Sequence, residues 1–369
     1  MRRQRELEQF LLNMPVKRLR GTTWKYYDIA PASGYTETMV VLPGGGVRPE
    51  AMYEHILGLA QGFRVVAPWY PEVFTELDDY VAGVFLLMRH ENIKRSHFFG
   101  LGFGSVVALH FLFRHPGRVL TCTLMHCPLP DESKMRPVEK ALRKVDITLG
   151  PIRRLMAGSA VKPRDIEEHV VDLTAGEKDM WMRNFRNFGD SKNAIFSRLE
   201  TLLDYHSNFG YRPSDFERWE GGKMFLLESE DDEYFDPENW EALRALFPAA
   251  TVYRFARCGH LHSLIRGKAL VDLVLRFSLD EDTYKDVTHL TEESPRNSET
   301  GDPSEHAFEV STDRPDEPSI NPPSAPASPQ GTPDFKREKK VDRTRKKPKE
   351  PEPVPHKDTL KQPLSSTTE

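Results

Sequence analysis

The stretch that decides the fold is His97-Phe98-Phe99-Gly100-Leu101-Gly102-Phe103-Gly104-Ser105. It begins with a short apolar run that is typical of a buried strand, and an apolar helical pattern over residues 106–113 follows it. Three glycines at alternate positions lie between the two. Glycine adopts backbone angles that other residues avoid and lets backbones approach closely. The sequence therefore predicts a sharp strand-to-helix turn centred on Gly102.

The spacing of these glycines is that of a nucleophile elbow, Gly-x-nucleophile-x-Gly. A Ser, Cys or Asp side chain normally occupies the central position, whereas Gly102 has no side chain. Ser105 does not replace it, because a frame centred on Ser105 would put Phe103 and Val107 where the turn accepts only small residues. We expect Gly102 at the nucleophile position and Ser105 as a packing residue. The alternative is an ordinary turn glycine in a different fold.

Apolar runs alternate with helical patterns on both sides of this turn. Between residues 128 and 219 the strand pattern stops, and short amphipathic helical patterns replace it. Alternating strands and helices predict a mostly parallel central sheet flanked by helices on both faces, here with a helical cap insertion. The strands are expected at residues 24–28, 38–43, 63–68, 97–99, 119–125, 224–227 and 251–255.

Composition divides the 369 residues into three parts. Residues 1–19 are expected as an N-terminal extension and 20–278 as one globular domain, with the cap at about 128–219. Residues 279–369 contain no Trp and nearly half of the 29 prolines. Such a segment buries too little apolar surface to offset its ordering entropy. We therefore expect 279–369 to be a disordered Pro/Ser/Thr-rich and basic tail.

Positions 20–278 resemble the α/β-hydrolase superfamily, because the elbow and several other motifs occur in the right order. Within it the chain looks most like the maspardin family. That resemblance rests on Trp24-Lys25-Tyr26-Tyr27-Asp28-Ile29-Ala30-Pro31, on Val41-Leu42-Pro43-Gly44-Gly45-Gly46 and on residues 62–71 with Trp69-Tyr70-Pro71. It implies an α/β-hydrolase fold and a protein that binds others in endosomal or Golgi trafficking without hydrolase activity. The chain departs from the pattern at Gly102, where maspardins keep a serine.

The superfamily resemblance also implies positions for the rest of a catalytic triad. The acid normally follows the strand after the cap, where Asp232 matches best and Asp231 next. The histidine normally stands in a Gly-His step, and His260 matches it. Gly44 and Gly45 stand where the superfamily forms part of its oxyanion hole with backbone N–H groups. We expect a contact between His260 and Asp232, as in an intact triad.

Other residues with reactive side chains have simpler structural interpretations. Cys127 beside His126, and Cys258 near His260, could form thiol nucleophiles, but neither cysteine lies in an elbow and buried cysteines are common. Three irregularly spaced cysteines fit neither a disulfide framework nor a zinc site, and no cofactor or metal is expected. Three aromatic residues of the cap could line a ligand pocket or simply pack: Trp181, Phe185 and Phe188.

Charge and hydropathy bear on location and partners. The net charge of −5 is mild, and no apolar run approaches the about 18 residues of a membrane span. Phe10-Leu11-Leu12 is too short for a signal-peptide core, so a cytoplasmic protein is expected. The basic run 336–349 could direct the chain to the nucleus or contact an anionic membrane. It lacks interleaved aromatics, so no nucleic-acid partner is expected.

Two functions therefore follow from the sequence. The first is a non-catalytic binding or adaptor protein with an unidentified protein partner and peripheral contact with endosomal or trans-Golgi membranes. The alternative is a cofactor-independent enzyme that uses a His260–Asp232 dyad for lyase or proton-abstraction chemistry, without a covalent nucleophile. Acyl-enzyme chemistry is disfavoured in both, because Gly102 offers no attacking atom.

Overall fold

A computed structural model describes most of the first 279 residues of the chain. Within these residues no helix is both long enough and apolar enough to cross a membrane. The described residues are 2–31, 34–35, 37–44, 46–147, 183–184, 187–232, 235, 237–256, 259–261, 263 and 266–279.

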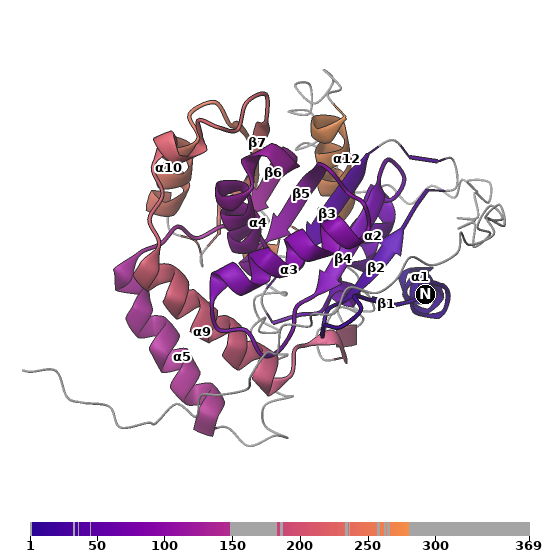
Figure 1. Cartoon of the computed structure of the whole chain (residues 1–369), viewed down its shortest axis with the longest axis horizontal. Coiled ribbons are helices and arrows are strands. Elements are labelled where there is room, and N and C mark those ends of the chain that lie inside the picture. The colour runs from indigo at the N-terminus through magenta and orange to yellow at the C-terminus, as the bar shows by residue number, and fades with distance from the viewer. Residues whose placement is uncertain are drawn as a thin grey trace, which may run out of the picture. The chain divides into compact units, whose positions relative to one another are not determined.

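The described strands form one eight-stranded sheet in the order β1-β2-β4-β3-β5-β6-β7-β8 (Figure 1). The strands β3 to β8 run parallel to their neighbours, whereas β1 and β2 pair antiparallel at one edge. The strands are β1 (Lys17–Arg18), β2 (Lys25–Ile29), β3 (Thr38–Leu42), β4 (Arg64–Trp69), β5 (Ser96–Leu101), β6 (Val119–Met125), β7 (Lys223–Ser229) and β8 (Thr251–Phe255).

Helices cover both faces of this sheet, as a parallel sheet with crossover helices requires (Figure 1). The α-helices are α1 (Arg2–Asn13), α2 (Tyr53–Leu59), α3 (Leu77–His90), α4 (Phe103–Arg114), α5 (Met135–Ile147), α9 (Lys192–Asn208), α10 (Pro237–Leu246) and α12 (Gly267–Ser278). The 3-10 helices are η1 (Pro49–Met52), η2 (Pro116–Arg118), η3 (Glu132–Lys134), η4 (Pro213–Phe216) and η5 (Gly259–Leu261).

Two apolar cores lie on opposite faces of the sheet, because successive strand side chains point to opposite sides. Phe98 of β5 belongs to the core that contains residues of α3, α4 and α10. The next residue, Phe99, belongs to the core that contains residues of α1, α2 and α12. Both side chains are fully buried. The central strands are therefore apolar on both faces, which explains their unbroken apolar runs.

The expected fold class is confirmed. The seven expected strands occur as β2 to β8, with bounds within two residues of their sequence patterns. Some of the helices expected in the cap lie outside the described residues. Residues 2–19, expected as an extension, instead contribute α1 and β1, and Leu7 and Phe10 of α1 are buried in one of the cores. Between β6 and β7 the described elements are helical, α5 and α9 among them, as expected of the cap. Of the expected tail, only Leu279 lies within the described residues.

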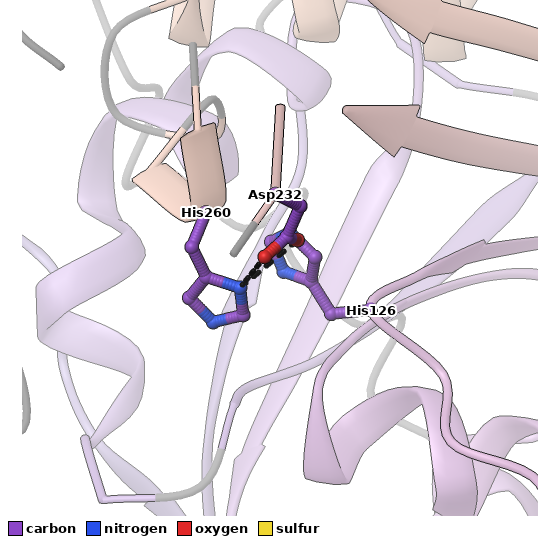
Figure 2. Close-up of side chains that lie close together, drawn as sticks. All are labelled: His126, Asp232 and His260. Atoms are coloured by element: carbon purple, nitrogen blue, oxygen red, sulfur yellow. Dashed lines mark hydrogen bonds and ion pairs between the residues drawn. The ribbon is translucent and has the colours of Figure 1, made fainter. Parts of the chain in front are cut away.

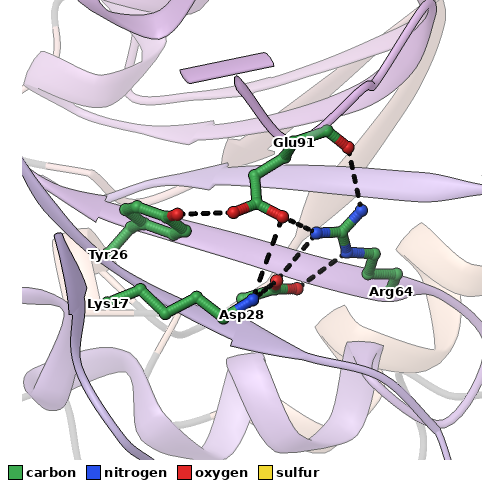
Figure 3. Close-up of polar contacts among 5 residues, drawn as sticks. All are labelled: Lys17, Tyr26, Asp28, Arg64 and Glu91. Carbon is green, nitrogen blue, oxygen red and sulfur yellow. Dashed lines mark hydrogen bonds and ion pairs between the residues drawn. The ribbon is translucent and has the colours of Figure 1, made fainter. Parts of the chain in front are cut away.

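A network of ion pairs and hydrogen bonds links the strands at the antiparallel edge of the sheet (Figure 3). Arg64 donates from Nε to Oδ1 and from Nη2 to Oδ2 of Asp28, both at 2.7 Å. Its Nη2 also pairs with Glu91, which follows α3, and Lys17 of β1 pairs with Asp28. Tyr26 donates its hydroxyl hydrogen to Glu91. Each charged group therefore has a partner of opposite charge, although the side chain of Asp28 is only 6% exposed.

Candidate functional site

The turn expected to be a nucleophile elbow is centred on Gly102, whose backbone angles are unusual. Gly102 lies between β5 and α4 with φ 54° and ψ −115°. Its N–H donates a hydrogen bond of 2.8 Å to the carbonyl of Met125, the last residue of β6. These angles cost a residue with a side chain about 1–3 kcal/mol, but glycine adopts them without a steric penalty. Gly102 therefore has backbone angles that would strain a residue with a side chain, and it offers no side-chain atom.

The flanking glycines are required by the close approach of strand and helix. A Cβ on Gly100 would lie 2.6 Å from the Gly104 carbonyl oxygen. A Cβ on Gly104 would overlap the Leu42 carbonyl and lie 2.6 Å from the Pro43 carbonyl oxygen. In proteins, a Cβ atom essentially never lies within 3.0 Å of a heavy atom to which it is not bonded. These two glycines are therefore fixed by packing.

Ser105 is a buried structural residue. Its side chain is inaccessible to solvent, and its hydroxyl lies 2.6 Å from the Gly100 carbonyl oxygen and 2.8 Å from that of Met125. The same oxygen accepts a hydrogen bond of 3.0 Å from the Met125 N–H. The hydroxyl therefore connects α4 to β5 and β6 through hydrogen bonds. Because it is buried, it is not available to a substrate.

Replacing Ser105 by alanine is expected to lower the free energy of unfolding by about 1–3 kcal/mol, because buried backbone groups lose their partner. Denaturant unfolding measures this change. The matched control Ser207→Ala removes an exposed hydroxyl and should change little. Unaltered stability of Ser105→Ala would contradict the structural role.

The structure brings Asp232 and His260 together at the carboxyl ends of β7 and β8 (Figure 2). Nδ1 of His260 lies 3.0 Å from each carboxylate oxygen of Asp232. The carboxylate is 1% exposed, whereas the histidine side chain is 36% exposed. Asp231, the second expected candidate, accepts a 2.9 Å hydrogen bond from the Gly259 N–H. Asp231 therefore joins the two loops, and Asp232 holds the imidazole.

A third side chain, His126, lies against the same carboxylate (Figure 2). Its Nε2 is 3.3 Å from Oδ2 of Asp232, and its ring stacks on that of His260, with centroids 4.1 Å apart and planes 25° apart. His126 directly follows β6 and has φ 52°, in the left-handed region that residues other than glycine rarely adopt. From the sequence, His126 is a candidate only as the neighbour of Cys127. Its place after an apolar strand was the signal that could have identified it.

Gly44, one of the expected oxyanion-loop residues, lies close to the elbow. A Cβ placed on Gly102 would be 3.9 Å from the Gly44 Cα, and a Cβ placed on Gly44 would be 3.4 Å from the Leu101 carbonyl oxygen. Gly45 lies outside the described residues. The loop after β3 and the turn after β5 therefore lie side by side, as an oxyanion hole requires.

The segment before α9 packs on this loop. The Arg48 N–H donates to the Phe188 carbonyl, and the Asp190 N–H donates to the Gly46 carbonyl, each at 2.9 Å. Arg198 of α9 forms a buried ion pair with Asp190. Its guanidinium also lies 5.9 Å from the centre of the ring of Phe103, the residue after Gly102. Residues between β6 and β7 therefore reach the elbow.

The remaining candidates offer no nucleophile within the described residues. Cys127 is buried, and burial raises the pKa of its thiol well above the ordinary value, so the reactive thiolate is disfavoured. Phe188 is 9% exposed and packs in a core. The other candidates lie outside the described residues: Cys258, Trp181 and Phe185.

Comparison with known proteins supports the fold. No protein-family model matches the sequence, and no curated protein matches it as a relative. A 2-hydroxy-6-oxo-6-phenylhexa-2,4-dienoate hydrolase from a Rhodococcus strain is similar in structure at 18% identity, covering 73% of this chain and 99% of its own, with a TM-score of 0.56. An enol-lactonase from Burkholderia xenovorans is similar at 17% identity, covering 72% and 100%, with a TM-score of 0.57. A hydrolase from Pseudomonas aeruginosa is similar at 14% identity, covering 72% and 98%, with a TM-score of 0.58.

The chain has the α/β-hydrolase fold: an eight-stranded, mostly parallel sheet with helices on both faces and helices between β6 and β7. Identities of 14% to 18% show the fold alone. The closer likeness to maspardins stays a prediction from sequence, and so do the roles of Gly102, Asp232 and His260.

Proposed function

We propose that this chain is a non-catalytic member of the α/β-hydrolase fold that acts by binding a protein partner. The observation that carries the proposal is Gly102, which lies on the turn between β5 and α4 with φ 54° and ψ −115° and has no side chain. Acyl transfer by this fold begins with attack by a side-chain atom at that position. Ser105 and Cys127 are buried and do not replace it.

A trafficking role makes the proposal more specific. It rests on the likeness of residues 24–31, 41–46 and 62–71 to maspardins, which implies an adaptor at endosomal or trans-Golgi membranes. The basic run 336–349 supplies positive charge for peripheral contact with an anionic membrane surface. Imaging of the full chain and of a chain ended at residue 278 against endosomal, Golgi and nuclear markers tests this part.

Activity profiling tests the absence of acyl-enzyme chemistry. The purified full chain is expected to show no labelling by a fluorophosphonate serine-hydrolase probe. It should also show no turnover of an ester panel beyond that of its His260→Ala variant. Labelling of the wild type, or ester turnover that His260→Ala abolishes, would contradict the non-catalytic proposal.

Gly102→Ser is expected to lower the free energy of unfolding by about 1–3 kcal/mol, because a residue with a side chain is strained at these angles. Within the part of the chain that the structure describes, the added Cβ comes no closer than 3.9 Å to an atom outside residues 101–103, the Gly44 Cα, so it overlaps none of them. Gly102→Ala is the matched variant and should lose as much, because the strain comes from Cβ and not from the hydroxyl. Urea unfolding of both variants measures the loss. A neutral or stabilising result would mean that the backbone at Gly102 is unstrained.

The His260–Asp232 contact favours a second candidate, an enzyme that uses His260 as a general base without a covalent intermediate. Asp232 faces Nδ1 and so fixes the ring, which leaves Nε2 as the atom that would accept a substrate proton. A turnover screen against small molecules with acidic C–H or O–H groups distinguishes the two candidates. Turnover that disappears in His260→Ala and persists in His90→Ala, which alters an exposed histidine, would support the enzyme.

A further inference from the structure

We infer that His126, Asp232 and His260 form a binding site for a divalent transition-metal ion of the zinc type. This goes beyond the proposed function, because neither protein binding nor the His–Asp dyad requires a metal or the imidazole of His126. The three residues each offer one ligand atom, and these atoms lie within 4.8 Å of one another. Two imidazoles and one carboxylate are a donor set that zinc accepts in proteins.

Two of the distances between the ligand atoms fit a common ion. Metal–ligand bonds of about 2.0–2.1 Å place tetrahedral ligands about 3.3–3.4 Å apart. Nε2 of His126 lies 3.3 Å from Oδ2 of Asp232, and Nδ1 of His260 lies 3.0 Å from the same oxygen. The two imidazole rings stack with their planes 25° apart, so one ring would have to turn to direct its in-plane lone pair at the ion. His260 has room for this turn, because it is 36% exposed, whereas His126 is 5% exposed.

Separate parts of the fold fix the ligands. His126, Asp232 and His260 follow the neighbouring strands β6, β7 and β8, whose carboxyl ends meet at one edge of the sheet. His126 keeps a left-handed backbone, φ 52°, which costs energy that the surrounding structure must balance. The neighbouring Met125 is tied to the elbow through the N–H of Gly102 and the hydroxyl of Ser105. The position of His126 is thus determined by the elbow itself.

The chemistry of the ligands selects the ion. Imidazole suits zinc, copper, iron and nickel, whereas calcium and magnesium prefer sites made of oxygen ligands. Three protein ligands leave a fourth position for water or another small ligand. The exposed side of His260 provides the route by which an ion and that ligand would enter.

Metal titration of the full chain tests the inference. After treatment with a chelator and desalting, the wild type is titrated with Zn²⁺ by calorimetry and with Co²⁺ by visible absorption, which reports tetrahedral coordination. We expect one ion to bind, with a rise in Tm, and Ca²⁺ or Mg²⁺ not to replace it. His126→Asn is expected to weaken this binding by more than about 100-fold. Asparagine tolerates the left-handed backbone, so this variant removes the imidazole with little strain.

Matched controls separate this site from the other histidines of the chain. His90→Ala changes an exposed histidine outside the cluster and should bind Zn²⁺ as the wild type does. Asp232→Asn gives a second ligand variant, and circular dichroism checks that each variant is folded. Absence of Zn²⁺ binding by the wild type, or unchanged binding by both folded ligand variants, would overturn the inference.

These outcomes are independent of the proposed function, because the titration contains no substrate. Zn²⁺ binding without turnover leaves both statements standing. Turnover that requires Zn²⁺ and disappears in His126→Asn would keep the metal site and contradict the non-catalytic proposal.

Discussion

Gly104→Ala is expected to prevent folding or to lower the free energy of unfolding by more than about 4 kcal/mol. The added Cβ would overlap the carbonyl of Leu42 and lie 2.6 Å from the carbonyl oxygen of Pro43. Both are backbone atoms, so no side-chain rotation relieves the overlap. Leu42 ends β3, which is hydrogen-bonded to β4 on one side and β5 on the other. Relief would therefore require the centre of the sheet to separate from α4.

Soluble yield and denaturant unfolding of the full chain measure this effect. Gly117→Ala is the matched control, because Gly117 is exposed and a Cβ there would meet no atom of the described residues within 4 Å. That variant should unfold within about 0.5 kcal/mol of the wild type. If Gly104→Ala is equally stable, helix α4 does not approach β3 as closely as the structure places it.

The elbow could be predicted from sequence because its constraints are local. Three glycines within five residues, between an apolar strand and an apolar helix, leave few ways to join the two elements. The same reasoning placed Ser105 correctly, since its neighbours Phe103 and Val107 cannot occupy the small positions of the turn. The structure adds what the Ser105 hydroxyl does: it forms hydrogen bonds with backbone groups of Gly100 in β5 and Met125 in β6.

The cluster of His126, Asp232 and His260 could not be predicted in this way, because its first and last residues are more than 100 positions apart in the sequence. Only the order of β6, β7 and β8 in the sheet brings their ends together. The resemblance to the superfamily predicts Asp232 and His260 but gives no role to His126. Helix α1 was missed for a related reason. The many charged residues of α1 give its sequence a polar character. The burial of Leu7 and Phe10 depends on residues of other elements that pack against them.

Arg64→Ala is expected to lower the free energy of unfolding by about 3 kcal/mol at neutral pH, because it leaves carboxylates without their main partner in a partly buried network. Arg64 makes two hydrogen bonds to Asp28 and also pairs with Glu91. Lys17 still contacts Asp28 in the variant and limits the loss. Arg143→Ala is the matched control, since that guanidinium is 82% exposed and pairs only at the surface, where ion pairs contribute little.

The pH dependence of this loss identifies Asp28 as its source. Burial raises the pKa of Asp28, but Arg64 and Lys17 hold it below its ordinary value of 3.8. A lowered pKa in the folded state stabilises the protein above pH 3.8, and this stability is lost as the pH falls through the folded value. Arg64→Ala removes one of the two groups that lower the pKa of Asp28, so this pKa is higher in the variant and ionised Asp28 stabilises the fold less at neutral pH. Protonation of Asp28 removes this contribution, so the difference between wild type and variant should shrink toward acid pH. Urea unfolding from pH 7 to pH 3 measures it, and a constant difference would mean that Arg64 acts through packing rather than charge.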